Sequence, residues 1–298
     1  ILMKNLLKSI SKRRFVLYFL SFIIFCLCIF YTIEEIITTL DIEKLGTVLN
    51  KNFFSIFLTS ILFATSHIFF SLAWKHLINN DSKDFSSKNS VTWHSYSQIF
   101  KYLPGPFLQH LGRHGIGLRM GINNKILIQS AVLDLIISSL AAVPYSFTAI
   151  IYFYFYTNIF TIVLLPLTAL LIFYLIKFFL SKFHSNAHVS FVYFFISQFI
   201  LLVTFFVLNY FLDVINLDLT TLIMTSMIYV LAWLIGMLTV GVPAGIGVRE
   251  AVMIYFLNNL LNQNDVIILV ILMRAVCIVG DLIAFMYSIK SINKLLKI

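Results

Sequence analysis

Eight apolar segments, separated by short polar connections, dominate this sequence and leave few folds open to it. They are Phe15–Ile33, Phe53–Ile78, Ile126–Ala142, Ile159–Phe179, Val189–Leu212, Leu219–Val240, Gly245–Leu261 and Val266–Ile289. A bilayer core about 30 Å thick is crossed by about 20 apolar residues in a helix. Inside a bilayer, a helix satisfies its own backbone polar groups. The sequence therefore predicts an all-α fold, a polytopic transmembrane helix bundle with about eight crossings, built as a single integral membrane domain over 1–298.

Charged residues are scarce and unevenly placed. Only 11% of the residues are charged, which is too few for the surface of a soluble domain of this length. Basic residues gather at both ends of the chain: Lys4, Lys8, Lys12, Arg13, Arg14, Lys290, Lys294 and Lys297. Basic flanks of membrane helices mark the cytoplasmic side. We therefore expect both termini in the cytoplasm and no nucleic-acid partner.

The three cysteines lie within apolar segments, where small buried side chains are the ordinary use of cysteine. They suggest neither a disulfide framework nor a metal site. The sequence gives no reason to expect a cofactor.

Two Pro/Gly breaks interrupt the apolar pattern. The first break is Pro104-Gly105, within 91–121. The second break comprises Pro243, Gly245 and Gly247. Non-helical backbone is tolerated at membrane depth only where protein buries it or where it lines a polar cavity. The two breaks therefore indicate where this chain handles a polar group.

The first break predicts a helix-break-helix hairpin over 91–121 that dips into the membrane and returns to the same side. The stretch Val91–Leu103 would be about 20 Å long as a helix, too short to cross. The part after Pro104 and Gly105 carries Arg113. An amphipathic hairpin lying flat on the membrane surface remains the alternative.

The second break predicts an anion site at the start of a helix. A helix restarting near Gly245 and Gly247 presents backbone N–H groups and a positive dipole end. Arg249 follows directly and could bind a phosphate in a forked geometry. Glu250 could neutralise Arg249 or another arginine, and a tight structural turn with a local ion pair is the alternative reading.

Three further ionisable residues lie within apolar segments: Asp134, Arg274 and Asp281. Such residues are costly in a membrane and mark functional sites. Asp134 and Asp281 are candidates for an intramembrane charge network, and Arg274 is expected to pair with Glu250 or Asp134.

These motifs resemble a known family. Tyr102-Leu103-Pro104-Gly105 with Gly112-Arg113, and the stretch from Pro243 to Glu250, are similar to the transmembrane region of lysylphosphatidylglycerol synthases and their stand-alone, flippase-like relatives. Asp134 and Arg274 fall where that family tends to place an aspartate and an arginine. The resemblance implies a protein of a bacterial or archaeal inner (plasma) membrane that translocates a lipid or a lipid-linked polar head. The sequence to Ile298 carries no soluble aminoacyl-transferase domain, so we expect no enzyme of that kind.

The leading hypothesis is thus a flippase-like protein that handles an anionic phospholipid or a polyprenyl-phosphate-linked head group. The candidate substrate-binding residues are Pro104, Gly105, Arg113, Pro243, Gly245, Gly247, Arg249, Glu250 and Arg274. Its expected partners are a membrane lipid or lipid-linked glycan, with glycosyltransferase or other envelope-synthesis proteins beside it.

Two alternatives stay open. A membrane-embedded glycosyltransferase using a polyprenyl-phosphate sugar could take Glu34 or Glu35 as its carboxylate. A non-catalytic scaffold of an envelope-polymer assembly complex would need no reactive group.

Overall fold

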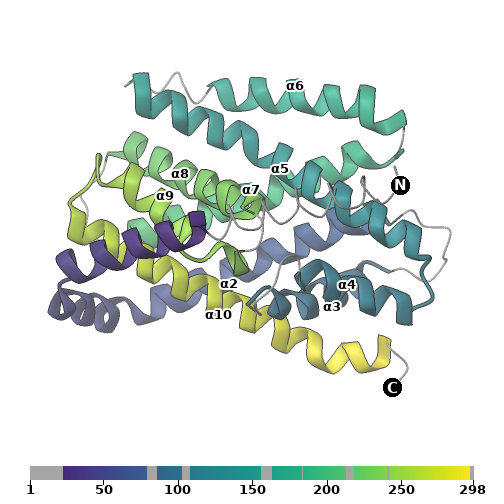
Figure 1. Ribbon diagram of the computed structural model, residues 1–298, viewed down its shortest axis with the longest axis horizontal. Coiled ribbons are helices and arrows are strands. Elements are labelled where there is room, and N and C mark those ends of the chain that lie inside the picture. Colours follow the sequence, from purple (N-terminus) through teal and green to yellow (C-terminus); the bar gives the residue numbers. More distant parts are fainter. Residues whose placement is uncertain are drawn as a thin grey trace, which may run out of the picture.

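Every regular element of the described chain is a helix. The computed structural model describes residues 23–78, 86–102, 108–155, 163–182, 184–212, 218–239 and 242–295. No β-strand occurs within these ranges, which confirms the predicted all-α class (Figure 1).

Six helices are long and apolar enough to cross a membrane. They are α2 (Ile42–Leu77), α5 (Asn124–Phe155), α6 (Leu164–Phe179), α7 (Ala187–Leu212), α8 (Leu219–Leu238) and α10 (Gln263–Leu295), with α6 continued by the 3₁₀ turn η3 (Leu180–Lys182). Figure 1 shows α6 along one outer edge of the bundle, where it packs on α5 and α7. By contrast, α8 is largely buried among its neighbours.

The predicted count of eight crossings is not confirmed. Most of Phe15–Ile33 lies outside the described residues, and the chain there is described as a helix only over 23–39. The predicted crossing Gly245–Leu261 contains α9 (Val248–Leu257), a helix of 10 residues. At 1.5 Å per residue α9 is about 15 Å long, about half of a bilayer core.

The path of the chain explains why α9 is needed despite its length. Helices α2 and α10 begin at the same end of the bundle, where Lys44 Nζ lies 2.5 Å from Asp265 Oδ1. The 3₁₀ turn η4 (Pro243–Gly245) instead contacts η1 (Gln98–Tyr102), deep in the bundle. Helix α9 therefore returns the chain from the middle of the bundle to the end where α10 starts.

The region predicted as a hairpin is built from two short helices. Helix α3 (Ser87–Ser97) runs into η1, and α4 (Leu108–Arg119) follows after residues outside the described chain. Pro104 and Gly105 of the first break are among those undescribed residues. The Trp93 side chain is fully buried, and α3 packs against both α2 and α10. Helix α3 is thus enclosed by the bundle rather than exposed along one face.

Glycine sets how closely α4 can pack. A Cβ atom added at Gly117 would lie 2.5 Å from Leu127 Cδ2 and 2.8 Å from the Trp93 ring. Contacts that short do not occur between real side chains, so only glycine lets α4 lie against α3 and α5 at this point. The Trp93 indole also donates to the Arg113 carbonyl oxygen over 3.0 Å. These contacts fix the position of the Arg113 side chain.

Candidate functional site

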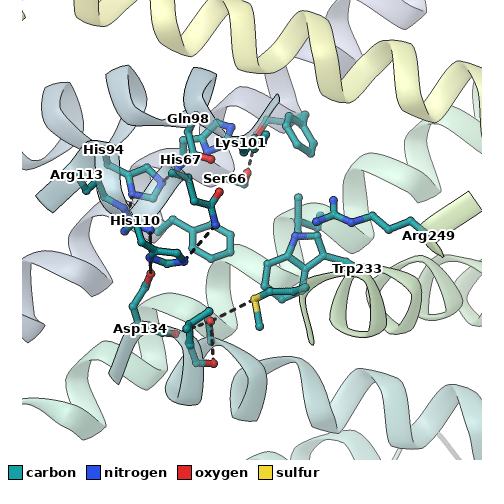
Figure 2. Close-up of a pocket in the computed structure, with 17 residues that line it drawn as sticks. Ser66, His67, His94, Gln98, Lys101, His110, Arg113, Asp134, Trp233 and Arg249 are labelled. Atoms are coloured by element: carbon teal, nitrogen blue, oxygen red, sulfur yellow. Dashed lines mark hydrogen bonds and ion pairs between the residues drawn. The ribbon is translucent and has the colours of Figure 1, made fainter. Parts of the chain in front are cut away.

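A polar cavity of about 80 Å³ lies where the long helices meet α4, η1 and the start of α9. Its polar lining includes His67, His94, His110, Arg113, Asp134 and Arg249. Figure 2 shows Arg249 and Trp233 on one side of the cavity and His94, His110 and Arg113 on the other. One water needs about 10–15 Å³ of such space. The cavity therefore has room for a few waters or for one small anion.

Arg113 and Asp134 form a buried ion pair at the wall of this cavity. Arg113 Nη2 lies 2.9 Å from Asp134 Oδ2, and the guanidinium lies over the Trp74 ring at 5.2 Å. Both side chains are less than one-tenth exposed. Since the arginine already has a carboxylate partner, a ligand there would meet a neutral pair rather than a bare cation.

Two histidines beside Arg113 are neutral. Burial first, and then the Arg113 charge, hold the pKa of His94 well below its usual range. The same two causes lower the pKa of His110 to about 3. Arg113 Nη2 donates to His110 Nδ1 over 3.1 Å, which requires that nitrogen to be unprotonated. The positive charge of the cavity thus resides on its arginines and on Lys101.

Asp281 forms the centre of a second network that joins three elements. Its carboxylate accepts from Lys101 Nζ at 2.7 Å and from His67 Nε2 at 2.8 Å. The Tyr102 hydroxyl donates to the other side of the same carboxylate. Burial and the neighbouring Asp281 raise the pKa of Tyr102, so its hydroxyl keeps its proton and donates. The network ties η1 to α2 and α10.

Glu250 pairs with Arg274, one of the two partners expected for this arginine. Arg274 Nε lies 3.3 Å from Glu250 Oε1. The other carboxylate oxygen of Glu250 accepts the Gly247 N–H over 2.6 Å. Glu250 therefore caps the first turn of α9 and neutralises Arg274, and it leaves Arg249 to another role.

Two glycines, Gly236 of α8 and Gly245 of the second break, make room for the Arg249 side chain. A Cβ atom at Gly236 would lie 2.5 Å from Arg249 Cγ, and one at Gly245 would lie 2.6 Å from Arg249 Nε. Gly245 and Gly247 also have φ values of 68° and 80°, in the left-handed region that favours glycine. Pro243 begins η4, which places this turn beside η1.

The N–H groups of Gly245 and Gly247 donate within the protein: Gly245 N–H to the Val242 carbonyl and Gly247 N–H to Glu250. The turn also leaves the space through which the Arg249 side chain reaches the cavity.

Among the residues that the structure describes, Arg249 is the cation at this site without an acidic partner. Four cations lie in and around the cavity (Lys101, Arg113, Arg249 and Arg274), against three carboxylates (Asp134, Glu250 and Asp281), a balance of 4 − 3 = +1. Within the described ranges, the Nε of Arg249 is buried and has no hydrogen-bond partner. Its guanidinium instead lies 5.9 Å from the centre of the Trp233 ring.

Sequence reasoning missed several cavity residues. Lys101 stands just before the first break, and this position was its only signal. His94, His110 and Trp233 come from three different elements, so their meeting depends on tertiary packing. No group of three or more metal-binding side chains is present in the part of the chain that the structure describes.

The carboxylates considered for a glycosyltransferase lie elsewhere. Glu34 and Glu35 stand on the helix over 23–39, where their backbone carbonyl oxygens accept hydrogen bonds from the Thr38 and Thr39 hydroxyls. Neither lines the polar cavity. No protein-family model and no curated protein matches this chain.

Proposed function

We propose that this protein is a flippase-like membrane protein that binds an anionic lipid head group at Arg249 and moves it across the bilayer. The cargo is an anionic phospholipid or a polyprenyl-phosphate-linked head group, which the protein moves without chemically transferring it. This is also the function implied by its resemblance to the lysylphosphatidylglycerol synthase transmembrane region.

The observation that carries the proposal is the Arg249 side chain. Its guanidinium lines a polar cavity, while Lys101, Arg113 and Arg274 each have a carboxylate within 3.3 Å. An unpaired cation held in a membrane interior is costly unless a ligand offsets it. A phosphate offers the charge and the paired oxygens that a guanidinium binds best.

The size of the cavity supports a small head group. A volume of about 80 Å³ suits a phosphate and its immediate neighbours, not a whole lipid. The apolar chain of the lipid must then remain outside the polar cavity, in contact with the membrane or with an apolar surface of the protein.

The placement of α3 and η1 supports a hairpin that enters the membrane from one side. Lys101 and Tyr102 at their tip share the Asp281 carboxylate with His67, which lies ten residues before the end of α2. That is about 15 Å along the helix, about half of the bilayer core. Together with the half-length α9, this gives two partial crossings that meet at the cavity.

Charge at the two ends of the bundle supports the proposed orientation. Lys75, Lys125 and Lys182 lie at the end where α3 and α4 pack, and Asp41 and Asp218 lie at the helix starts of the other end. Basic residues favour the cytoplasmic side. We place the hairpin and both termini on the cytoplasmic side of a bacterial or archaeal plasma membrane.

The test is lipid translocation by the purified full chain in proteoliposomes. Fluorescent phosphatidate and phosphatidylcholine are added to one leaflet, and their loss of accessibility to a membrane-impermeant quencher is timed. A hydrogen bond to a charged group contributes about 1.5–3 kcal/mol, so Arg249→Gln should slow phosphatidate movement about tenfold or more.

Arg119→Gln is the matched control, because Arg119 ends α4, is exposed and does not line the cavity. It removes the same charge and should leave the rate unchanged. Equal rates for wild type and Arg249→Gln would overturn the assignment of Arg249. Equal transport of phosphatidylcholine and phosphatidate would contradict an anion site.

A further inference from the structure

A second pocket, mostly apolar and about 220 Å³ in volume, lies between α4 and α5. Its apolar lining is Leu111, Ile128, Ala131, Val132 and Leu135, and two histidines complete it. The exposed fractions of Leu111, Ile128 and Val132 are 59%, 51% and 52%. The pocket is therefore open to the side of the bundle, where lipid surrounds α5.

This lateral pocket adjoins the polar cavity. His110 and Leu135 line both spaces, so one wall of the cavity is also the inner wall of the pocket. His110 is neutral and has polar neighbours on the cavity side, where it accepts from Arg113. Its ring thus forms a boundary between a polar space and an apolar one.

The depth of the lateral pocket matches one leaflet of a membrane. Ile128, Ala131 and Leu135 lie in the first turns of α5, which starts at Asn124. Residue 128 is four positions from that start, about 6 Å along the helix. A lipid of the leaflet at this end has its phosphate near the level of the helix start and its chains beside these residues.

We propose that the lateral pocket holds the apolar chain of the lipid whose anionic head group occupies the cavity, so that the lipid enters sideways between α4 and α5. The inference rests on the proposed function and adds the path of the lipid and its two-part binding mode. The head group passes His110 to reach Arg249, and the chain stays on the apolar side of that ring.

The reason why the lipid chain would lie in the lateral pocket is geometric rather than hydrophobic. Lipid chains are as apolar as the side chains of the pocket, so a chain gains little by leaving the bilayer for the protein. A chain covalently joined to a head group in the polar cavity must nevertheless leave that cavity through an apolar opening. The pocket between α4 and α5 offers such an opening directly beside the cavity.

A larger apolar groove elsewhere provides the contrast. It has a volume of about 510 Å³, lies between α2, α3 and α10, and includes Ala64. None of its lining residues also lines the polar cavity. A chain lying in that groove would be separated from the head-group site by the buried face of α2.

The test compares one bulky substitution in each space. Ala131→Trp fills the lateral pocket, and Ala64→Trp fills the larger groove; both alanines are half-buried on long helices. Binding of dioleoyl phosphatidate and of glycerol phosphate, which has no chain, is titrated with the full chain in phosphatidylcholine nanodiscs. Bound probe is counted by native mass spectrometry, because the introduced tryptophans would obscure any fluorescence change of Trp233 beside Arg249.

We expect Ala131→Trp to weaken dioleoyl phosphatidate binding about tenfold, the cost of forcing a chain into an overpacked space. Its affinity for glycerol phosphate should stay at the wild-type value, and Ala64→Trp should change neither. Leu111→Trp, at an exposed position on α4, repeats the block without disturbing buried packing.

The outcomes separate the two proposals. Unchanged phosphatidate binding in both Ala131→Trp and Leu111→Trp would overturn the lateral pocket while leaving the Arg249 site intact. Loss of glycerol phosphate binding in Arg249→Gln supports the head-group site by itself. If the wild-type chain binds neither probe, the proposed function fails, and the lateral path fails with it.

Discussion

Arg249 and Arg274 lie near the start of α9, and the same substitution should change the stability of the fold differently at each. Arg274 is paired with Glu250, whereas Arg249 packs on Trp233 and has no acidic partner within the described residues. Replacing each with glutamine removes one positive charge from nearly the same place. The effect on the free energy of unfolding depends on whether the substitution leaves a buried charge without a partner.

For Arg274→Gln we expect a loss of about 3 kcal/mol, because removing one partner strands a buried charge. The carboxylate left behind is that of Glu250, whose side chain is only 13% exposed. For Arg249→Gln the lost cation–π contact with Trp233 is worth about 0.5–2 kcal/mol. The substitution also removes an unpaired guanidinium whose Nε is buried, and this gain offsets that loss. The net change should therefore be close to zero or stabilising.

Unfolding in mixed micelles with increasing dodecyl sulfate, followed by circular dichroism, measures both changes. The double variant Arg274→Gln/Glu250→Gln is the control, since removing both charges should recover much of the stability lost by Arg274→Gln alone. The reasoning is refuted if Arg249→Gln destabilises the fold as strongly as Arg274→Gln. That result would mean that Arg249 is satisfied within the protein and is not held for an anion.

Three further predictions concern the surroundings of the cavity. Asp281→Asn should destabilise the fold by about 3 kcal/mol, and adding Lys101→Met should restore part of it in a double-mutant cycle of unfolding free energies. Gly236→Ala should weaken phosphatidate binding without changing any charge, because the new methyl group displaces Arg249; unaltered affinity would contradict the described path of that side chain. Lowering the pH from 7 to 5 should reduce stability, because the unfolded chain takes up a proton near pH 6.5 that folded His110, with a pKa of about 3, does not. His110→Gln should remove part of this loss and leave the part due to His94, whose pKa is also held low by burial.

The fold class and the candidate ionisable residues could be predicted from the sequence, because both follow from the cost of placing polar groups in lipid. It identified Arg249, Arg274, Glu250, Asp134 and Asp281 from their placement in apolar segments. The pairing of Arg274 with Glu250 was also foreseeable, since both lie near the second break. These inferences need only local composition.

Other features depend on contacts between distant elements. Hydropathy could not distinguish a full crossing from α9, because the apolar turn before α9 and Leu260 and Leu261 after it lengthen the apolar stretch beyond the helix. The structure shows that Gly236 and Gly245 make space for the Arg249 side chain, a contact that the sequence did not indicate. Lys101 contacts Asp281 from 180 positions away in the chain. No local pattern encodes that contact.

The shared starting point of α2 and α10 has a mechanical consequence. The two helices are fastened together at one end by Lys44 and Asp265, while α3 lies wedged between them toward the other. If α3 shifts, the far ends of α2 and α10 should separate more than the ends that Lys44 and Asp265 join. We expect spin labels near residues 75 and 289 to change their separation when phosphatidate binds, and labels near residues 44 and 265 to keep theirs. Equal changes in separation at both ends would contradict a pivot at the end joined by Lys44 and Asp265.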